Sequence, residues 1–189
     1  MEDYMLSGYI GSLIGVLVTV VLFFIKELCE NIACTNAIKA EIKCLSVMCN
    51  ERFDFEIFNG EPYLRLSYPL DTDYFTVFNN NSSKIGKIFD RDERELIIEI
   101  YITAKYFVDC LKTNNSCLDR FDKIEEKYGI SGKNSKEYEE EIVFARESLI
   151  HSKENNILPT YKKLKSLLAR MRYESPFDFL TNATKMPRK

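Results

Sequence analysis

The six cysteines include the spacings in this chain that come closest to a chemical site. Cys29-x4-Cys34 and Cys44-x4-Cys49 repeat one spacing, and the other two cysteines are Cys110 and Cys117. By spacing alone, each pair supplies half of the four ligands of a tetrahedral zinc site. Both pairs lie within one expected helix, however, and no histidine completes a ligand set. The sequence therefore favours packing cysteines, and we expect neither a metal nor another cofactor.

Catalytic residues are equally hard to assemble. The only histidine is His151, so a histidine-based triad would have to use it. No serine has a nucleophile-elbow context, and the glycines outside the first apolar segment are too scattered for a phosphate-binding loop. The acidic residues lie on solvent-type helix faces. We therefore expect no catalytic residue and a protein that is not an enzyme; a bound metal or nucleotide would revive an enzymatic reading.

The strongest feature is an apolar segment, Met5 to Ile25, with 21 consecutive uncharged residues. Crossing a hydrocarbon core of about 30 Å takes about 20 helical residues. Charged residues flank the segment on both sides, and a charge near mid-bilayer would cost several kcal/mol. The pattern predicts a transmembrane helix over residues 5–25 behind a short tail, residues 1–4.

A cleaved signal peptide is the main alternative to a membrane span. It needs a basic start, about 7–15 apolar residues and a small-residue cleavage site, whereas this segment has an acidic start, is longer and ends in Val21-Leu22-Phe23-Phe24-Ile25. Lysines follow the span but do not precede it, which favours a cytoplasmic C-terminal side. The cysteines do not form a loop-rich disulfide framework. We expect a single-pass protein of the cell inner membrane with a cytoplasmic domain.

Three small residues share one face of this span. Ser7, Gly11 and Gly15 follow at spacings of four, the small-x-x-x-small pattern that lets two membrane helices approach closely. Glycine is also ordinarily common in membrane helices, which is the competing explanation. The pattern predicts a helix–helix contact in the membrane and a homo-oligomer.

The remainder predicts a mainly α fold. Residues 26–175 suit one helical domain followed by a basic tail, residues 176–189, in a chain that is 46% hydrophobic and 29% charged. We expect an antiparallel bundle of about four helices, with an ordered loop or short strand inserted near residues 56–89. The strand is expected around Tyr63–Leu66.

The expected helices have recognisable ends. The first continues from the membrane to Asn50, and a second begins at an Asp90 cap and ends at Thr113–Asn115. A shorter helix follows from Cys117 and closes at Gly129. The last runs from about Lys136 to Tyr173, and Pro159 either kinks it or splits it.

Basic residues gather at the end of that last helix. They are Lys162, Lys163, Lys165, Arg170 and Arg172. A solvated helix face is one explanation, and contact with anionic membrane lipid is another. Contact with nucleic-acid phosphates is a third, but a net charge of −3 and the absence of Trp make nucleic acid an unlikely partner.

One loop-like segment, Tyr74 to Gly86, combines aromatic residues with a polar run and leads into the capped helix. Its candidate interaction residues are Tyr74, Phe75, Phe78, Asn81 and Lys84. The alternative is that these residues only dock the segment on the domain.

This segment, Tyr-Phe-Thr-Val-Phe-Asn-Asn-Asn-Ser-Ser-Lys-Ile-Gly, resembles a motif of uncharacterised bacterial inner-membrane proteins. Those proteins have one N-terminal span and a helical cytoplasmic domain, and they look like products of prophage, mobile or defence loci. The resemblance covers about Tyr74 to Leu111 and the overall layout. It implies no catalytic residue.

Two functional hypotheses follow. The first is a non-enzymatic, membrane-anchored interaction protein that self-associates through its span and engages a cytoplasmic protein partner, in phage defence or superinfection exclusion. The second is a membrane-perturbing effector triggered through its soluble domain, although few polar groups in the span would line an aqueous path.

Overall fold

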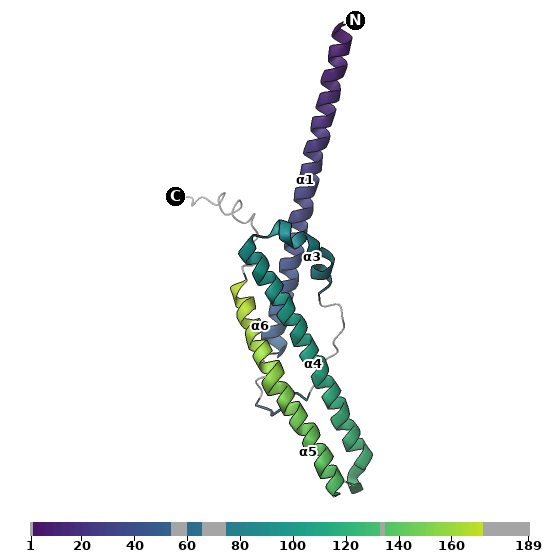
Figure 1. The fold of residues 1–189 in the computed structure, drawn as a ribbon, viewed down its shortest axis with the longest axis vertical. Helices are drawn as coiled ribbons and strands as arrows, with labels where there is room; N and C mark the ends of the chain where they lie inside the picture. Colours follow the sequence, from purple (N-terminus) through teal and green to yellow (C-terminus); the bar gives the residue numbers. More distant parts are fainter. Residues whose placement is uncertain (1, 54–59, 66–74, 133–134, 172–189) are drawn as a thin grey trace, which may run out of the picture.

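The chain is all-helical in its computed structural model, which describes residues 2–53, 60–65, 75–132 and 135–171. Within these ranges, the side chains of residues 2–8, 52 and 130–132 are not described. A long apolar N-terminal helix continues into a helical bundle (Figure 1). The predicted mainly α fold is therefore confirmed.

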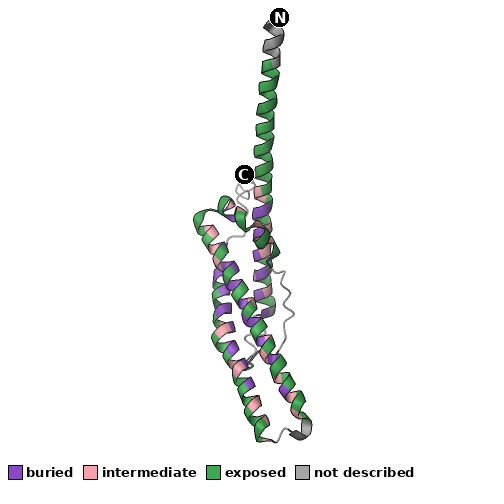
Figure 2. Cartoon of the chain, turned by 45° about the vertical axis from the view of Figure 1, so that its right-hand side comes forward, coloured by how far each residue is buried: buried purple, intermediate pink, exposed green. Residues whose placement is uncertain are grey.

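Helix α1 (Glu2–Met48) has 47 residues and ends in a π-helical turn, η1 (Cys49–Phe53). At 1.5 Å per residue it is about 70 Å long. Its first part is exposed and stands clear of the bundle, whereas its last part carries a buried stripe (Figure 2). The stripe contains Ile38, Ile42 and Leu45 and continues to Cys49 at the start of η1. The predicted continuation of the first helix to about residue 50 is thus confirmed.

Helix α3 (Thr76–Ile88) occupies a segment that we expected to be a loop. The run Asn79–Ser83 has weak intrinsic helix propensity, but contacts from elsewhere hold it helical. The Val77 and Phe78 N–H groups donate to the Glu41 carboxylate at 3.0 and 3.1 Å. The predicted strand is also wrong over residues 63–65, which are irregular, and Leu66 lies outside the described residues.

Helix α4 (Arg91–Gly132) replaces two predicted helices. Its Asp90 cap is confirmed, since Asp90 Oδ1 accepts from the Glu93 N–H at 2.8 Å. The break expected at Thr113–Asn115 does not occur: Asn114 is fully buried, and Thr113 Oγ1 bonds back to the Asp109 carbonyl at 3.0 Å. A kink interrupts α4 at Gly129, where φ is 54° and where we expected the shorter helix to close, and a last short helical piece follows to Gly132.

The chain then returns through α5 (Lys136–His151), the π-helical segment η2 (Ser152–Ile157) and α6 (Leu158–Arg170). Ser135 caps α5, accepting from the Tyr138 N–H at 3.1 Å. Pro159 does not separate the helices: the Leu158 N–H reaches the Lys153 carbonyl, and the proline sits in the first turn of α6, where its missing N–H is tolerated.

The last part of α1 packs with α4 and α6, and α4 and α5 extend beyond the end of α1 as a hairpin (Figure 1). Helix α4 runs in the same direction as α1, and α5 and α6 run back against it. Antiparallel packing therefore holds for α4 against α5 and α6 but not for α1 against α4. The main core joins α1, α3, α4 and α6. A smaller cluster of Tyr63, Leu118 and Leu149 lies in the hairpin, which continues past the end of α1.

Candidate functional site

The exposed first part of α1 is the largest uncovered apolar surface among the described residues. From Tyr9 to Ile25 its large apolar side chains are 46–74% exposed. Within the described chain, α1 is the one helix long and apolar enough to cross a membrane. Length and composition alone do not distinguish a membrane span from an N-terminal signal sequence, which meets the same criterion.

Two of the three small residues predicted for a membrane contact are unobstructed. A Cβ atom added at Gly11 or Gly15 would meet nothing within 4 Å. Thr19 Oγ1 donates to the Gly15 carbonyl at 2.8 Å, so this hydroxyl is satisfied within the helix. The side chain of Ser7 lies outside the described residues. The two glycines therefore leave a shallow, unfilled strip on the helix.

This strip faces away from the bundle. Gly15 and Ile42 are 27 residues apart, about seven and a half turns at 3.6 residues per turn, and therefore lie on opposite sides of α1. Ala33, Ala40 and Val47 follow Gly15 by 18, 25 and 32 residues, close to about 5, 7 and 9 turns. All three are exposed. The outer face of α1, defined by Gly11, Gly15, Ala33, Ala40 and Val47, is thus uncovered from the apolar part into the bundle.

The predicted loop residues lie against the domain. Phe75 is buried, and its ring meets Tyr101 edge to face with 5.8 Å between centroids. Phe78 stacks on the same ring at 3.8 Å, and Lys105 Nζ lies over the Phe78 ring at 5.6 Å. Phe75 also lines an apolar cavity of about 30 Å³ with Leu45, a volume that holds about one water molecule and no organic ligand. These two aromatic rings dock α3.

The other predicted loop residues do not join them in one site. Asn81 Nδ2 bonds to the Val77 carbonyl within α3 at 2.8 Å. Lys84 Nζ lies 3.7 Å from Glu30, on α1. Tyr74 lies outside the described residues. The segment therefore contacts α1 and α4 through several side chains that do not converge on a pocket.

Sequence reasoning missed Glu41, whose carboxylate joins α1 to α3 and α4. Besides the two N–H groups of α3, its carboxylate accepts the Tyr101 hydroxyl at 2.5 Å. Burial and the Glu41 carboxylate together raise the pKa of Tyr101 far above the usual tyrosine range. Its neighbour Lys39 is buried and pairs with Glu93 at 2.9 Å. Neither role has a local signal, because both partners lie on distant segments.

The predicted basic surface is only partly free. Lys163 Nζ pairs with Glu99 at 3.0 Å, and Lys165 Nζ lies 6.0 Å above the Tyr161 ring. Lys162 and Arg170 are exposed, and Arg172 lies outside the described residues. The surface runs along α6, whose last turn lies at the end of the bundle from which α1 emerges (Figure 1).

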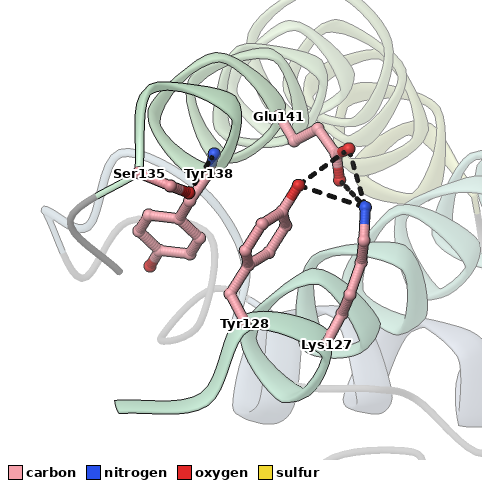
Figure 3. A network of polar contacts seen from close by, with 5 residues as sticks. All are labelled: Lys127, Tyr128, Ser135, Tyr138 and Glu141. Carbon is pink, nitrogen blue, oxygen red and sulfur yellow. Dashed lines mark hydrogen bonds and ion pairs between the residues drawn. The ribbon is translucent and has the colours of Figure 1, made fainter. Parts of the chain in front are cut away.

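The far end of the hairpin holds a polar network (Figure 3). Lys127 Nζ lies 2.9 Å from Glu141, and the Tyr128 hydroxyl donates to the same carboxylate at 3.2 Å. Hydrogen bonds to Glu141 and Tyr128 raise the pKa of Lys127, and the bond from Lys127 lowers the pKa of Glu141. These groups are largely exposed and fasten α4 to α5.

Metal-ligating side chains do not gather anywhere in the described part of the chain. No group of three or more His, Cys, Asp and Glu residues there is arranged to hold a metal ion. The six cysteines are free thiols, and burial raises the pKa of Cys34 and Cys110. His151 Nδ1 is 3.0 Å from the Asn155 side chain. Cys34, Cys49 and Cys110 are buried in the main core.

Comparisons with known proteins add no relative: no protein-family model, no curated protein and no solved structure matches the chain. The layout expected from the resemblance, a long apolar helix followed by a helical region, is present. The family itself is not identified.

Proposed function

We propose that this protein is a non-enzymatic, membrane-anchored interaction protein that self-associates through α1 and engages a cytoplasmic protein partner. In this proposal residues 5–25 span the cell inner membrane once and the bundle lies in the cytoplasm. The biological setting that we propose is phage defence or superinfection exclusion, on the strength of the resemblance described above.

The observation that carries the proposal is the outer face of α1. The glycines lie opposite the buried stripe, so the bundle of one copy does not obstruct the approach of a second α1. Membrane helices associate through small residues that let their backbones come close. The same face continues past the apolar part through Ala33 and Ala40, which are small as well as exposed. A parallel pair would therefore meet along both parts of the helix.

Membrane lipid is the second proposed contact. The α6 surface that includes Lys162 and Arg170 ends near the point where α1 leaves the bundle. Basic side chains close to an anionic leaflet contribute about 1 kcal/mol each. This contact would orient the bundle against the membrane and leave the hairpin for a protein partner.

The test compares self-association of the full chain in detergent micelles and in nanodiscs. Gly11→Leu with Gly15→Leu fills the strip, and we expect association at least about tenfold weaker, a loss of about 1.4 kcal/mol. The matched control is Val16→Leu with Val20→Leu, which has the same spacing on the other side of α1. Sedimentation and single-molecule photobleaching measure the stoichiometry. If both double variants associate equally, the glycine strip does not mediate self-association and the span serves only to anchor the bundle.

Membrane potential separates this function from a membrane-perturbing effector. We expect cells that overproduce the full chain to keep their membrane potential and growth rate, because the apolar part of α1 has few polar groups to line an aqueous path. Depolarisation that is lost in the Gly11→Leu and Gly15→Leu double variant would favour the effector instead.

A further inference from the structure

Beyond the end of α1, a short irregular segment packs against the hairpin of α4 and α5. We call residues 60–65 the strap; they lie where α1 has stopped and α4 and α5 continue (Figure 1). Two adjacent strap side chains are buried in different places. Tyr63 belongs to the hairpin cluster, and Leu64 belongs to the main core. The strap thus joins the two cores through one aromatic and one aliphatic residue.

The helices hold the strap by its backbone. Asn114 Nδ2 on α4 donates to the Leu64 carbonyl at 3.4 Å, and Lys153 Nζ on η2 donates to the Glu61 carbonyl. Burial lowers the pKa of Lys153. Backbone carbonyls are common to every peptide, so these two bonds recognise an extended chain and not a particular side chain. Asn114, Leu118, Phe121, Leu149 and Lys153 form what we call the strap seat.

The seat is not fully satisfied by its present occupant. Among the described residues, Asn114 Oδ1 and Ser152 Oγ are buried side-chain atoms without a hydrogen-bond partner. Two contacts fix how α4 lies against the returning chain: Phe107 packs on Tyr161, and Lys127 pairs with Glu141. Asn114 lies between Phe107 and Lys127 in the sequence, so it is opposite the start of η2, which contains Ser152. An unpaired buried polar atom is unusual and costly.

An extended peptide has the groups that would satisfy this seat. An Asn side chain has both a donor and an acceptor, and it can pair with the carbonyl and the N–H of one peptide residue together. The strap uses only the donor of Asn114. The π-helical segment η2, which brings Ser152 and Lys153 inward, is of a kind frequently found at functional sites.

We propose that the strap seat is a binding site for an extended peptide, that residues 60–65 occupy it as an internal ligand, and that a segment of the protein partner displaces them. The partner segment has an aromatic residue followed by an aliphatic one, matching Tyr63 and Leu64. The inference rests on the proposed function in that it names the chemistry of the partner and the place where it docks.

The strap itself supplies the probe. A fluorescent ten-residue peptide with the sequence of residues 58–67 is titrated against the full chain in detergent micelles. The strap variant, Tyr63→Ala with Leu64→Ala, keeps the strap backbone but loses the two side chains that fill the seat, so the internal ligand competes less, and we expect this variant to bind the peptide at least about tenfold more tightly than the unmodified chain does. A control peptide with Ala at both positions should not bind. Adding Asn114→Ala to the strap variant should weaken binding about fivefold or more, the effect of one lost hydrogen bond.

Two results would overturn the proposal: no saturable binding by a strap variant whose helical circular dichroism is unchanged, or equal binding of both peptides. If the strap variant does not fold, a peptide with benzoylphenylalanine at the Tyr63 position is cross-linked to the unmodified chain. Cross-links within residues 114–121 and 149–153 are expected, and cross-links elsewhere or none would overturn it. Because the peptide is synthetic, the result does not depend on self-association through α1, so each proposal can fail alone.

Discussion

The two parts of α1 place the same residue types in opposite surroundings. Ile14 in the first part is 57% exposed, and Ile42 in the last part is fully buried. The backbone is one continuous helix, so the difference lies in how side chains are distributed around it. The first part is apolar on every face, as a helix in lipid is, and the last part is apolar on one stripe, as a helix on a protein core is.

Polar groups differ between the two parts in the same way. The first part has Thr19, which bonds to its own helix. The last part has Lys39 and Glu41, which bond to α4 and α3. The single helix α1 thus combines an exposed apolar part with a part whose polar side chains reach other helices, and the described contacts of this kind occur where the bundle surrounds α1.

The largest expected effect comes from the buried stripe. Ile42→Ala removes a fully buried side chain, and we expect the free energy of unfolding of the bundle to fall by about 2–5 kcal/mol. Val18→Ala is the matched control in the first part, where the side chain is 50% exposed in the isolated chain. Urea denaturation of the full chain in micelles, followed by circular dichroism, measures both. Equal losses would contradict the division of α1 into two environments.

Glu41 gives the next effect. Glu41→Ala leaves the Val77 and Phe78 N–H groups without their acceptor, and we expect a loss of about 1–3 kcal/mol. The control is Glu30→Ala on the same helix, where the side chain is 52% exposed. Hydrogen exchange should speed up at the start of α3 in the first variant only. Unchanged exchange there would show that the carboxylate does not hold α3.

Tyr101 links stability to alkaline pH. Its folded-state pKa lies above the ordinary value of 10.0, so its contribution is complete below pH 10 and is lost as the pH rises further, because the unfolded chain releases the proton first. Tyr101→Phe should cost about 0.5–1.5 kcal/mol at pH 8 and flatten the decline above pH 10. Urea midpoints at pH 8 and pH 11 test this, with Tyr9→Phe in the exposed part as the control. A parallel decline in both variants would count against it.

The smallest effect is expected at the tip of the hairpin. Lys127 and Glu141 pair in water, with side chains 59% and 42% exposed, and such pairs contribute little to stability. Lys127→Gln should leave the urea midpoint unchanged in the same assay, in contrast to the buried Lys39. A clear shift would mean that the hairpin tip is part of the cooperative core.

Local patterns were sufficient where the relevant contact is local. The uncharged run from Met5 predicted the exposed part of α1, and the cap at Asp90 was predictable because the cap and its N–H donor lie three residues apart. The loop expected over part of residues 74–86 was wrong, because Glu41, 36 residues before Val77, caps α3 there. The break expected near Asn114 was wrong for a similar reason: a residue type common in turns is buried against the distant strap. Burial of Lys39 and occupation of the strap seat likewise depend on partners far away in the sequence.

The continuity of α1 also has a mechanical consequence. With no break between Glu2 and Met48, the exposed part and the buried part of α1 keep a fixed rotational relation to each other. Each residue contributes about 100° of rotation. One residue inserted between Lys26 and Glu30 would therefore swing the whole bundle by about that angle around the glycine strip. If two copies associate through α1 as proposed, the length of this short stretch sets which surfaces of their bundles face each other, and a twist applied at one end of the helix would be transmitted to the other.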